Sequence, residues 1–300
     1  MSIKIKLLIF IGVFLICSVA VSGQTDWSKI EVKATHVAGN IYMLEGAGGN
    51  IGVSVGPDGI LIVDDQFAPL ADKIKAALNK LGEGKLKFVL NTHYHGDHTG
   101  SNTAFGPDAL IIAHDNVRKR LSTEQVSKFF KRTTPATPKE GLPVVTFDHA
   151  VTIHFNGEEI KVVHFPSSHT DGDSIIYFTG SNVIHMGDNF FNPRFPVVDL
   201  EAGGNVLGMT KTVGEVLAKL PAGVKIIPGH GPLSDPAGLK DFHRMLTETT
   251  AIVQKKKKAG KTLDEVKKEG LPEEWKTWGS GFIKTDIWIE LVYNSLPTKR

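Results

Sequence analysis

The chain contains one short segment dense in polar side chains, Asn91-Thr92-His93-Tyr94-His95-Gly96-Asp97-His98-Thr99-Gly100, from which its architecture can be inferred. The short apolar run at 86–90 just before it predicts a buried parallel strand. Gly100 predicts a turn after it. Its polar side chains are therefore expected in the loop at the carboxyl end of a strand, where open α/β sheets place their functional sites. Those side chains are His93, His95, Asp97 and His98.

The composition of this stretch favours a metal site. Histidine makes up 12 of the 300 residues, so chance is a poor explanation for three within six positions. A structural zinc site is the alternative, but such sites are usually rich in cysteine and closed. Because side chains alternate between the two faces of a strand, His93 and His95 point to the same face, whereas Asp97 and His98 lie beyond the strand. One rigid corner can therefore supply ligands to two neighbouring ions.

Three more candidate ligands follow later strands. His169 lies in a turn-rich loop after a predicted strand. Asp188 follows the apolar run 183–185, and His230 follows the run 224–227 within Pro-Gly-His-Gly-Pro. All of the candidates thus stand at strand ends, and the chain falls in the α/β class.

The pattern His-x-His-x-Asp-His, followed in order by His169, Asp188 and His230, resembles the metallo-β-lactamase superfamily over about residues 41–232. The resemblance implies an αββα sandwich, in which two β-sheets lie face to face with helices outside, built as two similar halves. It also implies two zinc ions per chain, with iron as the alternative. The implied ligands are His93, His95 and His169 for the first ion, Asp97, His98 and His230 for the second, and Asp188 bridging both.

The N-terminus has the pattern of a signal peptide at residues 1–23. Lys4 and Lys6 precede an apolar run at 7–21 that is short for a membrane span. An uncleaved anchor is the alternative, and a lipoprotein at Cys17 is disfavoured by the bulky Ile16. We expect an exported, periplasmic or secreted protein whose residues 24–300 form a single domain with C-terminal helices, and no membrane contact after cleavage.

Cleavage would leave a mature chain of balanced charge without a thiol. Of the 34 Lys and Arg residues, 32 remain against 32 Asp and Glu, so no nucleic-acid partner is implied. The only cysteine, Cys17, leaves with the signal, so cysteine can be neither ligand nor nucleophile. A small molecule is the expected partner.

Other segments carry secondary expectations. Residues 116–131 are predicted to be helical, and a second set of strands is expected to begin at 144–147. The glycine-rich loop 46–50 is either a hairpin turn or a mobile flap over the substrate. Asp64 and Asp65 either orient a ligand histidine or merely end a strand. His114 is a weaker candidate for such a role.

The expected chemistry is metal-assisted hydrolysis of a β-lactam, lactone, thioester or related carbonyl compound. In the implied dinuclear site, ions about 3.5–4 Å apart share a hydroxide that attacks the substrate, and Asp97 is the catalytic residue that orients it. We expect Arg194 to bind a substrate carboxylate. An apolar wall beside the metals is expected from Phe190, Phe191 and Phe195.

Departures from known subfamilies narrow the function. The commonest β-lactamase subclass has a cysteine where Asp188 stands, and a second subclass normally lacks this bridging aspartate. Glyoxalase II-like thioesterases and lactonases share all seven ligands, although residues 189–195 do not resemble the glutathione-site signature of the former. The alternatives are a β-lactamase proper, a mononuclear iron dioxygenase acting on persulfides, and a binding protein without catalysis.

Overall fold

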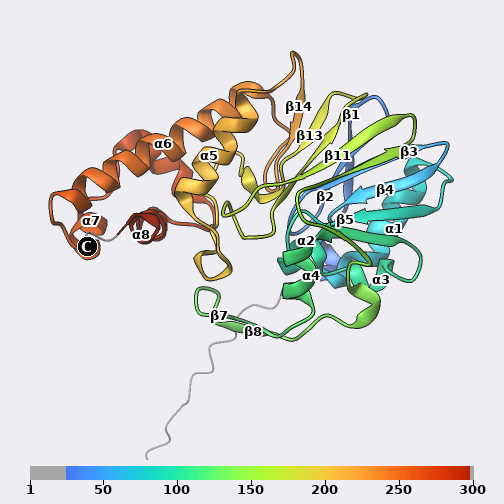
Figure 1. Ribbon diagram of the computed structural model, residues 1–300, viewed down its shortest axis with the longest axis horizontal. Helices are drawn as coiled ribbons and strands as arrows, with labels where there is room; N and C mark the ends of the chain where they lie inside the picture. The colour runs from blue at the N-terminus through green and yellow to red at the C-terminus, as the bar shows by residue number, and fades with distance from the viewer. Residues whose placement is uncertain (1–24, 298–300) are drawn as a thin grey trace, which may run out of the picture.

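The computed structural model describes residues 25–297 (Figure 1). The predicted signal peptide at residues 1–23 lies outside the described residues. Within residues 25–297, no helix combines the length and the apolar character that crossing a membrane requires.

The first sheet has seven strands. Its first four strands pair in an antiparallel manner, and the remaining neighbours pair in parallel. In spatial order they are β1 (Lys33–Ala38), β2 (Ile41–Glu45), β3 (Ile51–Gly56), β4 (Gly59–Val63), β5 (Leu86–Leu90), β6 (Leu110–His114) and β9 (Val145–Phe147).

The second sheet has five strands and repeats this plan. Its first four strands are antiparallel, and the last pair is parallel. In spatial order they are β10 (Ala150–Phe155), β11 (Glu158–His164), β12 (Ser174–Phe178), β13 (Val183–His185) and β14 (Lys225–Ile227). The strand expected to open the second set at 144–147 is β9, which instead pairs with β6 and closes the first sheet.

Both faces of each sheet are buried, because side chains alternate along a strand. Leu61 of β4 packs between the sheets in the same cluster as Ile176 of β12. The next residue along β4, Ile62, packs outward with Ile74 of the helix α1 (Ala71–Leu81). Ile175 of β12 likewise packs outward, in the cluster formed with the C-terminal helices.

Helices cover both outer faces, so the predicted αββα sandwich is confirmed (Figure 1). On the first sheet and at its loops lie α1 (Ala71–Leu81), α2 (Gly96–Thr99), α3 (Asn102–Phe105) and α4 (Asp115–Leu121). Beyond the second sheet lie α5 (Val206–Leu217), α6 (Pro236–Lys258), α7 (Leu263–Glu269) and α8 (Thr285–Ser295).

The prediction of a helix over 116–131 is wrong beyond Leu121. The chain instead forms a hairpin of β7 (Gln125–Ser127) and β8 (Arg132–Thr134), which is a separate two-stranded sheet (Figure 1). The carboxylate of Glu201 accepts hydrogen bonds from the backbone N–H groups of Lys128 (2.9 Å) and Phe129 (3.5 Å) at the hairpin tip. A contact distant in sequence thus stabilises a turn where local propensity favours a helix.

Candidate metal centre

The seven predicted ligands converge at the carboxyl-end loops of both sheets. Each of two groups offers one ligand atom per residue, and within a group these atoms lie within 4.8 Å of one another. The first group is His93, His95, His169 and Asp188, and the second is Asp97, His98 and His230. The loops after β5, β11, β13 and β14 supply them, so the strand ends bring together residues up to 137 positions apart, from His93 to His230.

Asp188 lies between the two groups. Its Oδ2 is 3.4 Å from Nε2 of His169 and 3.8 Å from Nε2 of His93. Its Oδ1 is 3.1 Å from Nε2 of His98 and 3.3 Å from Nε2 of His230. Oδ1 is also buried and accepts no hydrogen bond. Each carboxylate oxygen therefore faces a different group, as a bridging ligand requires.

Four of the histidines have their outward ring nitrogen next to an oxygen acceptor, which directs the bare nitrogen inward. The pairs are His93 Nδ1 with Thr92 Oγ1 (3.0 Å), His95 Nε2 with Asp199 Oδ2 (2.9 Å), His98 Nδ1 with Asp64 Oδ2 (2.7 Å) and His169 Nδ1 with the carbonyl of Val197 (2.7 Å).

The inward nitrogens of two of these histidines test whether a cation fits. His95 Nδ1 and His169 Nε2 face each other at 2.9 Å. Because each ring donates its proton on the outward side, two lone pairs would repel across this gap. A cation bound by both nitrogens and by Asp188 would remove this repulsion. The residues present therefore fit a metal ion.

Of the two alternatives for these acids, Asp64 contacts a candidate ligand histidine, whereas the side chain of Asp65 does not. Asp64 is fully buried and accepts hydrogen bonds from the backbone N–H and the hydroxyl of Thr92, both at 2.7 Å, in addition to His98. Its φ of 65° is rare for a non-glycine residue, and these bonds hold it there. Asp65 instead accepts from the backbone N–H of Ser101 at 2.9 Å.

The buried carboxylates give the site a charge that favours a bound cation. Burial, together with the neighbouring His98, lowers the pKa of His93 well below its usual value. Burial opposes ionisation of Asp188, yet the surrounding histidines hold the pKa of this carboxyl well below its usual value. Burial would lower the pKa of His230, but the carboxylates of Asp188 and Asp97 raise it to about 9. These carboxylates create a demand for positive charge that a metal ion satisfies.

The loop between β2 and β3 packs directly on the site. The backbone N–H of Gly49 donates to the carbonyl of Asp97 at 3.1 Å. A Cβ added at Gly49 would lie 2.1 Å from Cε1 of His98, so only glycine allows this approach. The side-chain amide of Asn50 donates to the carbonyls of Pro228 (2.9 Å) and Gly231 (2.8 Å). The loop is therefore fixed to the segment carrying His230 and is more than a hairpin turn.

A cavity of about 330 Å³ opens onto the site. Of the predicted substrate residues, Phe191, Arg194 and Phe195 line it. Phe191 also stacks on His230, with ring centroids 4.9 Å apart. The expectation for Phe190 is wrong: it is fully buried and packs against Phe242 of α6, because successive side chains of this extended segment point to opposite sides.

Several residues at the site carried no sequence signal. Asp199, which contacts His95, also accepts a hydrogen bond from the hydroxyl of Tyr94 at 2.6 Å. Phe130 and Arg132 reach the cavity from the hairpin that replaced the predicted helix. The ring of His114, in contrast, stacks on that of His164, with centroids 3.6 Å apart, and its hydrogen bonds are to Asp148 and Asn116 rather than to a candidate ligand.

Comparison with known proteins agrees with this geometry. A family model described as the metallo-beta-lactamase superfamily matches residues 34–230. Hydroxyacylglutathione hydrolase of Nitrosococcus oceani is 28% identical over 57% of this chain and 58% of its own length. Lactamase-like protein aptB of Emericella nidulans is 27% identical over 71% of this chain and 65% of its own length. The chain thus spans less than two thirds of these relatives.

Solved structures show the same fold at low identity. The sec-alkylsulfatase Pisa1 from Pseudomonas sp. superposes with a TM-score of 0.65 at 17% identity, covering 88% of this chain and 50% of its own. The DIM-1 metallo-beta-lactamase has a TM-score of 0.59 at 20% identity, covering 74% of this chain and 99% of its own. At these identities the likeness concerns the fold alone.

Proposed function

This chain belongs to the metallo-β-lactamase superfamily, whose members are metal-dependent hydrolases, and we propose that it hydrolyses a small carbonyl substrate with two zinc ions. The proposed ligands are the seven side chains of the candidate metal centre. The observation that carries the proposal is the pair of bare nitrogens on His95 and His169, which face each other at 2.9 Å beside Asp188. The complete second group around His98 supports two ions rather than one.

Asp188 and Asp97 would have different roles in the proposed reaction. When bound, two zinc ions lower the pKa of water to about 7 and polarise a carbonyl. Asp188, only 4% exposed, would fix the separation of the two positions. Asp97 is 25% exposed and borders the cavity, so it can orient a water molecule toward the substrate. Burial opposes its ionisation, yet the adjacent His98 and His230 lower its pKa, so it is ionised and can accept a hydrogen bond.

The substrate class follows from the relatives and from the cavity. A thioester is supported by the hydroxyacylglutathione hydrolases among the relatives, and a lactone or a β-lactam uses the same carbonyl chemistry. Arg194 borders the cavity and is proposed to attract a substrate carboxylate. Export to the periplasm or beyond is proposed from residues 1–23, with residues 24–300 as one catalytic domain.

Metal analysis tests the proposal directly. We expect about two zinc ions per purified chain, whereas one iron ion would favour the persulfide dioxygenase alternative. The purified protein is then assayed on a β-lactam, a lactone, a thioester and a phosphodiester. Asp188→Ala should lower metal content and hydrolysis together, whereas the exposed Asp148→Ala should change neither. Normal turnover in Asp188→Ala would remove the proposed bridging role.

A further inference from the structure

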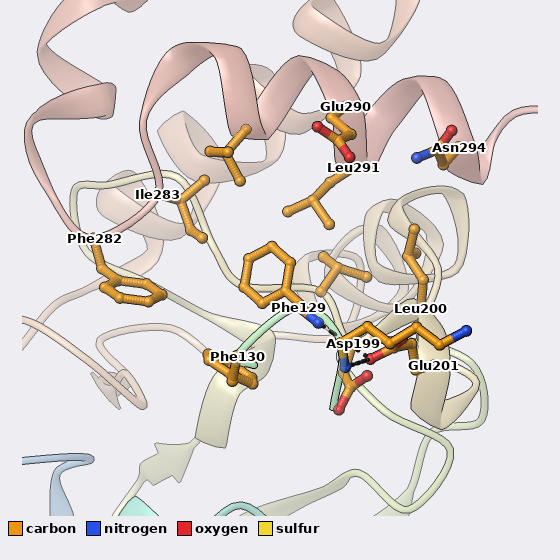
Figure 2. Close-up of a pocket in the computed structure, with 13 residues that line it drawn as sticks. Phe129, Phe130, Asp199, Leu200, Glu201, Phe282, Ile283, Glu290, Leu291 and Asn294 are labelled. Carbon is orange, nitrogen blue, oxygen red and sulfur yellow. Dashed lines mark hydrogen bonds between the residues drawn. The ribbon is translucent and has the colours of Figure 1, made fainter. Parts of the chain in front are cut away.

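A second cavity of about 550 Å³ lies beside the metal centre, with no proposed ligand in its lining (Figure 2). It is enclosed by the tip of the β7–β8 hairpin, the segment after Val197 and one face of α8. Figure 2 shows Phe129 projecting into it, with Leu291 above and Leu200 to the right. Ile283 and Ile287 add to the lining, so most of the wall is apolar.

The carboxylates that border this cavity already have partners. Glu201 accepts from the backbone of the hairpin tip, and Glu290 pairs with Lys267. Asp199 accepts from His95 and Tyr94 at the metal centre. These groups are therefore occupied with holding the walls in place. Lys128 and Asn294 are the other polar residues of the lining, and the rest of the lining is apolar, which favours an apolar ligand.

The second cavity adjoins the metal cavity across a shared wall. Phe130, Phe282 and Ile283 line both. The ring of Phe130 lies 6.0 Å from that of His95 and stacks on Phe282 at 6.2 Å. Phe282 is 70% exposed, so its ring can turn aside without opening the core. A chain that starts at the metal centre can thus pass these two rings into the second cavity.

We propose that the second cavity binds the apolar chain of the substrate, whose reacting carbonyl lies at the metal centre. The substrate class is then an ester, thioester or lactone that carries an alkyl chain of medium length. This inference rests on the proposed hydrolase function and adds the part of the substrate that does not react. In the reaction, water adds its oxygen to the acyl carbon and the bond to the leaving group breaks, giving the carboxylic acid and the protonated leaving group.

A series of p-nitrophenyl esters tests the chain-length dependence. With zinc-loaded protein, kcat/KM should rise about threefold to fourfold for each methylene added from acetate through butanoate to octanoate, until the cavity is filled. Ile287→Trp fills the cavity from α8 and should reduce the ratio of octanoate to acetate ester hydrolysis by at least tenfold. Asp286→Trp, an exposed neighbour outside the lining, is the matched control and should keep the wild-type ratio.

A binding measurement separates this inference from the hydrolase proposal. In isothermal titration calorimetry, sodium octanoate should bind at least tenfold more tightly than sodium acetate, and Ile287→Trp should abolish the difference. Phe129→Ala, at the 39% exposed hairpin tip, should weaken octanoate binding without the risk of disturbing α8. If octanoate binds in this way but no ester is cleaved, the cavity assignment stands and the hydrolase proposal fails. Ester cleavage that ignores chain length, with equal affinities for octanoate and acetate, would overturn the cavity assignment alone.

Discussion

Replacing Asp64 by asparagine should weaken the second metal position without removing any ligand. Oδ1 of Asp64 accepts from the backbone N–H of Thr92, and Oδ2 accepts from the Thr92 hydroxyl and from Nδ1 of His98. An asparagine keeps only one oxygen. If that oxygen serves the backbone, the new NH₂ group faces His98, whose Nδ1 must then become the acceptor. The proton of His98 would move to Nε2, which points into the metal site.

The expected magnitude follows from this change of tautomer. The loss of an outer partner of a metal-bound histidine typically costs 10- to 100-fold in affinity, or about 1.4–2.7 kcal/mol. In the opposite orientation of the amide, its NH₂ group faces the buried N–H of Thr92, and an unsatisfied buried donor costs about 1–3 kcal/mol. In either orientation of the introduced amide, the free-energy cost of keeping His98 in its metal-binding position is therefore similar.

The neighbouring carboxyl supplies a matched control. Asp65 is equally buried, contacts no ligand side chain, and has one oxygen without a hydrogen-bond partner. Burial raises the pKa of Asp65 well above its usual value. Asp65→Asn therefore makes the same exchange of carboxyl for amide at an equally buried neighbouring position. Zinc affinity is measured by competition with a chromogenic chelator, and folding by circular dichroism. If Asp64→Asn and Asp65→Asn bind zinc equally well, Asp64 does not set the tautomer of His98.

Three further predictions concern the same centre. Gly49→Ala should displace His98 and lower zinc content by about half, because the new Cβ would lie 2.1 Å from the ring. Gly96→Ala is the control: its new Cβ meets nothing within 4 Å, so this variant should bind zinc normally although it lies inside the histidine motif. Asp199→Asn should reduce hydrolysis about 10- to 100-fold through His95, with acetate-ester kcat as the readout. Removing metal with a chelator should lower the melting temperature by on the order of 5–10 °C. The reason is that a ligand present at 100 times its Kd stabilises the folded state by about 2.7 kcal/mol. An unchanged melting curve would show that no metal was bound.

The candidate ligands could be placed together from the sequence because they stand where apolar strands end. His93 follows the run that becomes β5, and His230 follows the run that becomes β14. A short apolar run fixes the position of the strand, and parallel strands deliver their carboxyl ends to one edge. The same reasoning placed Asp188 after β13. No knowledge of loop conformation was needed for these three positions.

The substrate side could not be predicted in the same way, because its residues depend on loop conformation. Phe190 and Phe191 are adjacent and chemically identical, and only the parity of the extended segment decides which one faces the cavity. Asp199 is 104 residues from His95 and lies in no recognisable motif. Its role follows from the path of the chain after β13, which local pattern does not specify.

The contact between Glu201 and the β7–β8 hairpin explains both the wrong helix prediction and the proposed substrate specificity. Residues 122–134 leave the helical path because Glu201, in the short 3-10 helix Leu200–Ala202, accepts hydrogen bonds from the backbone of Lys128 and Phe129. The same contact holds Phe129 over the second cavity and Phe130 beside His95. A helix continued through these residues would present both rings on its own surface and leave both cavities without this wall. Substrate choice in this chain is therefore expected to change with the hairpin, while the metal centre, built from strand ends, stays the same.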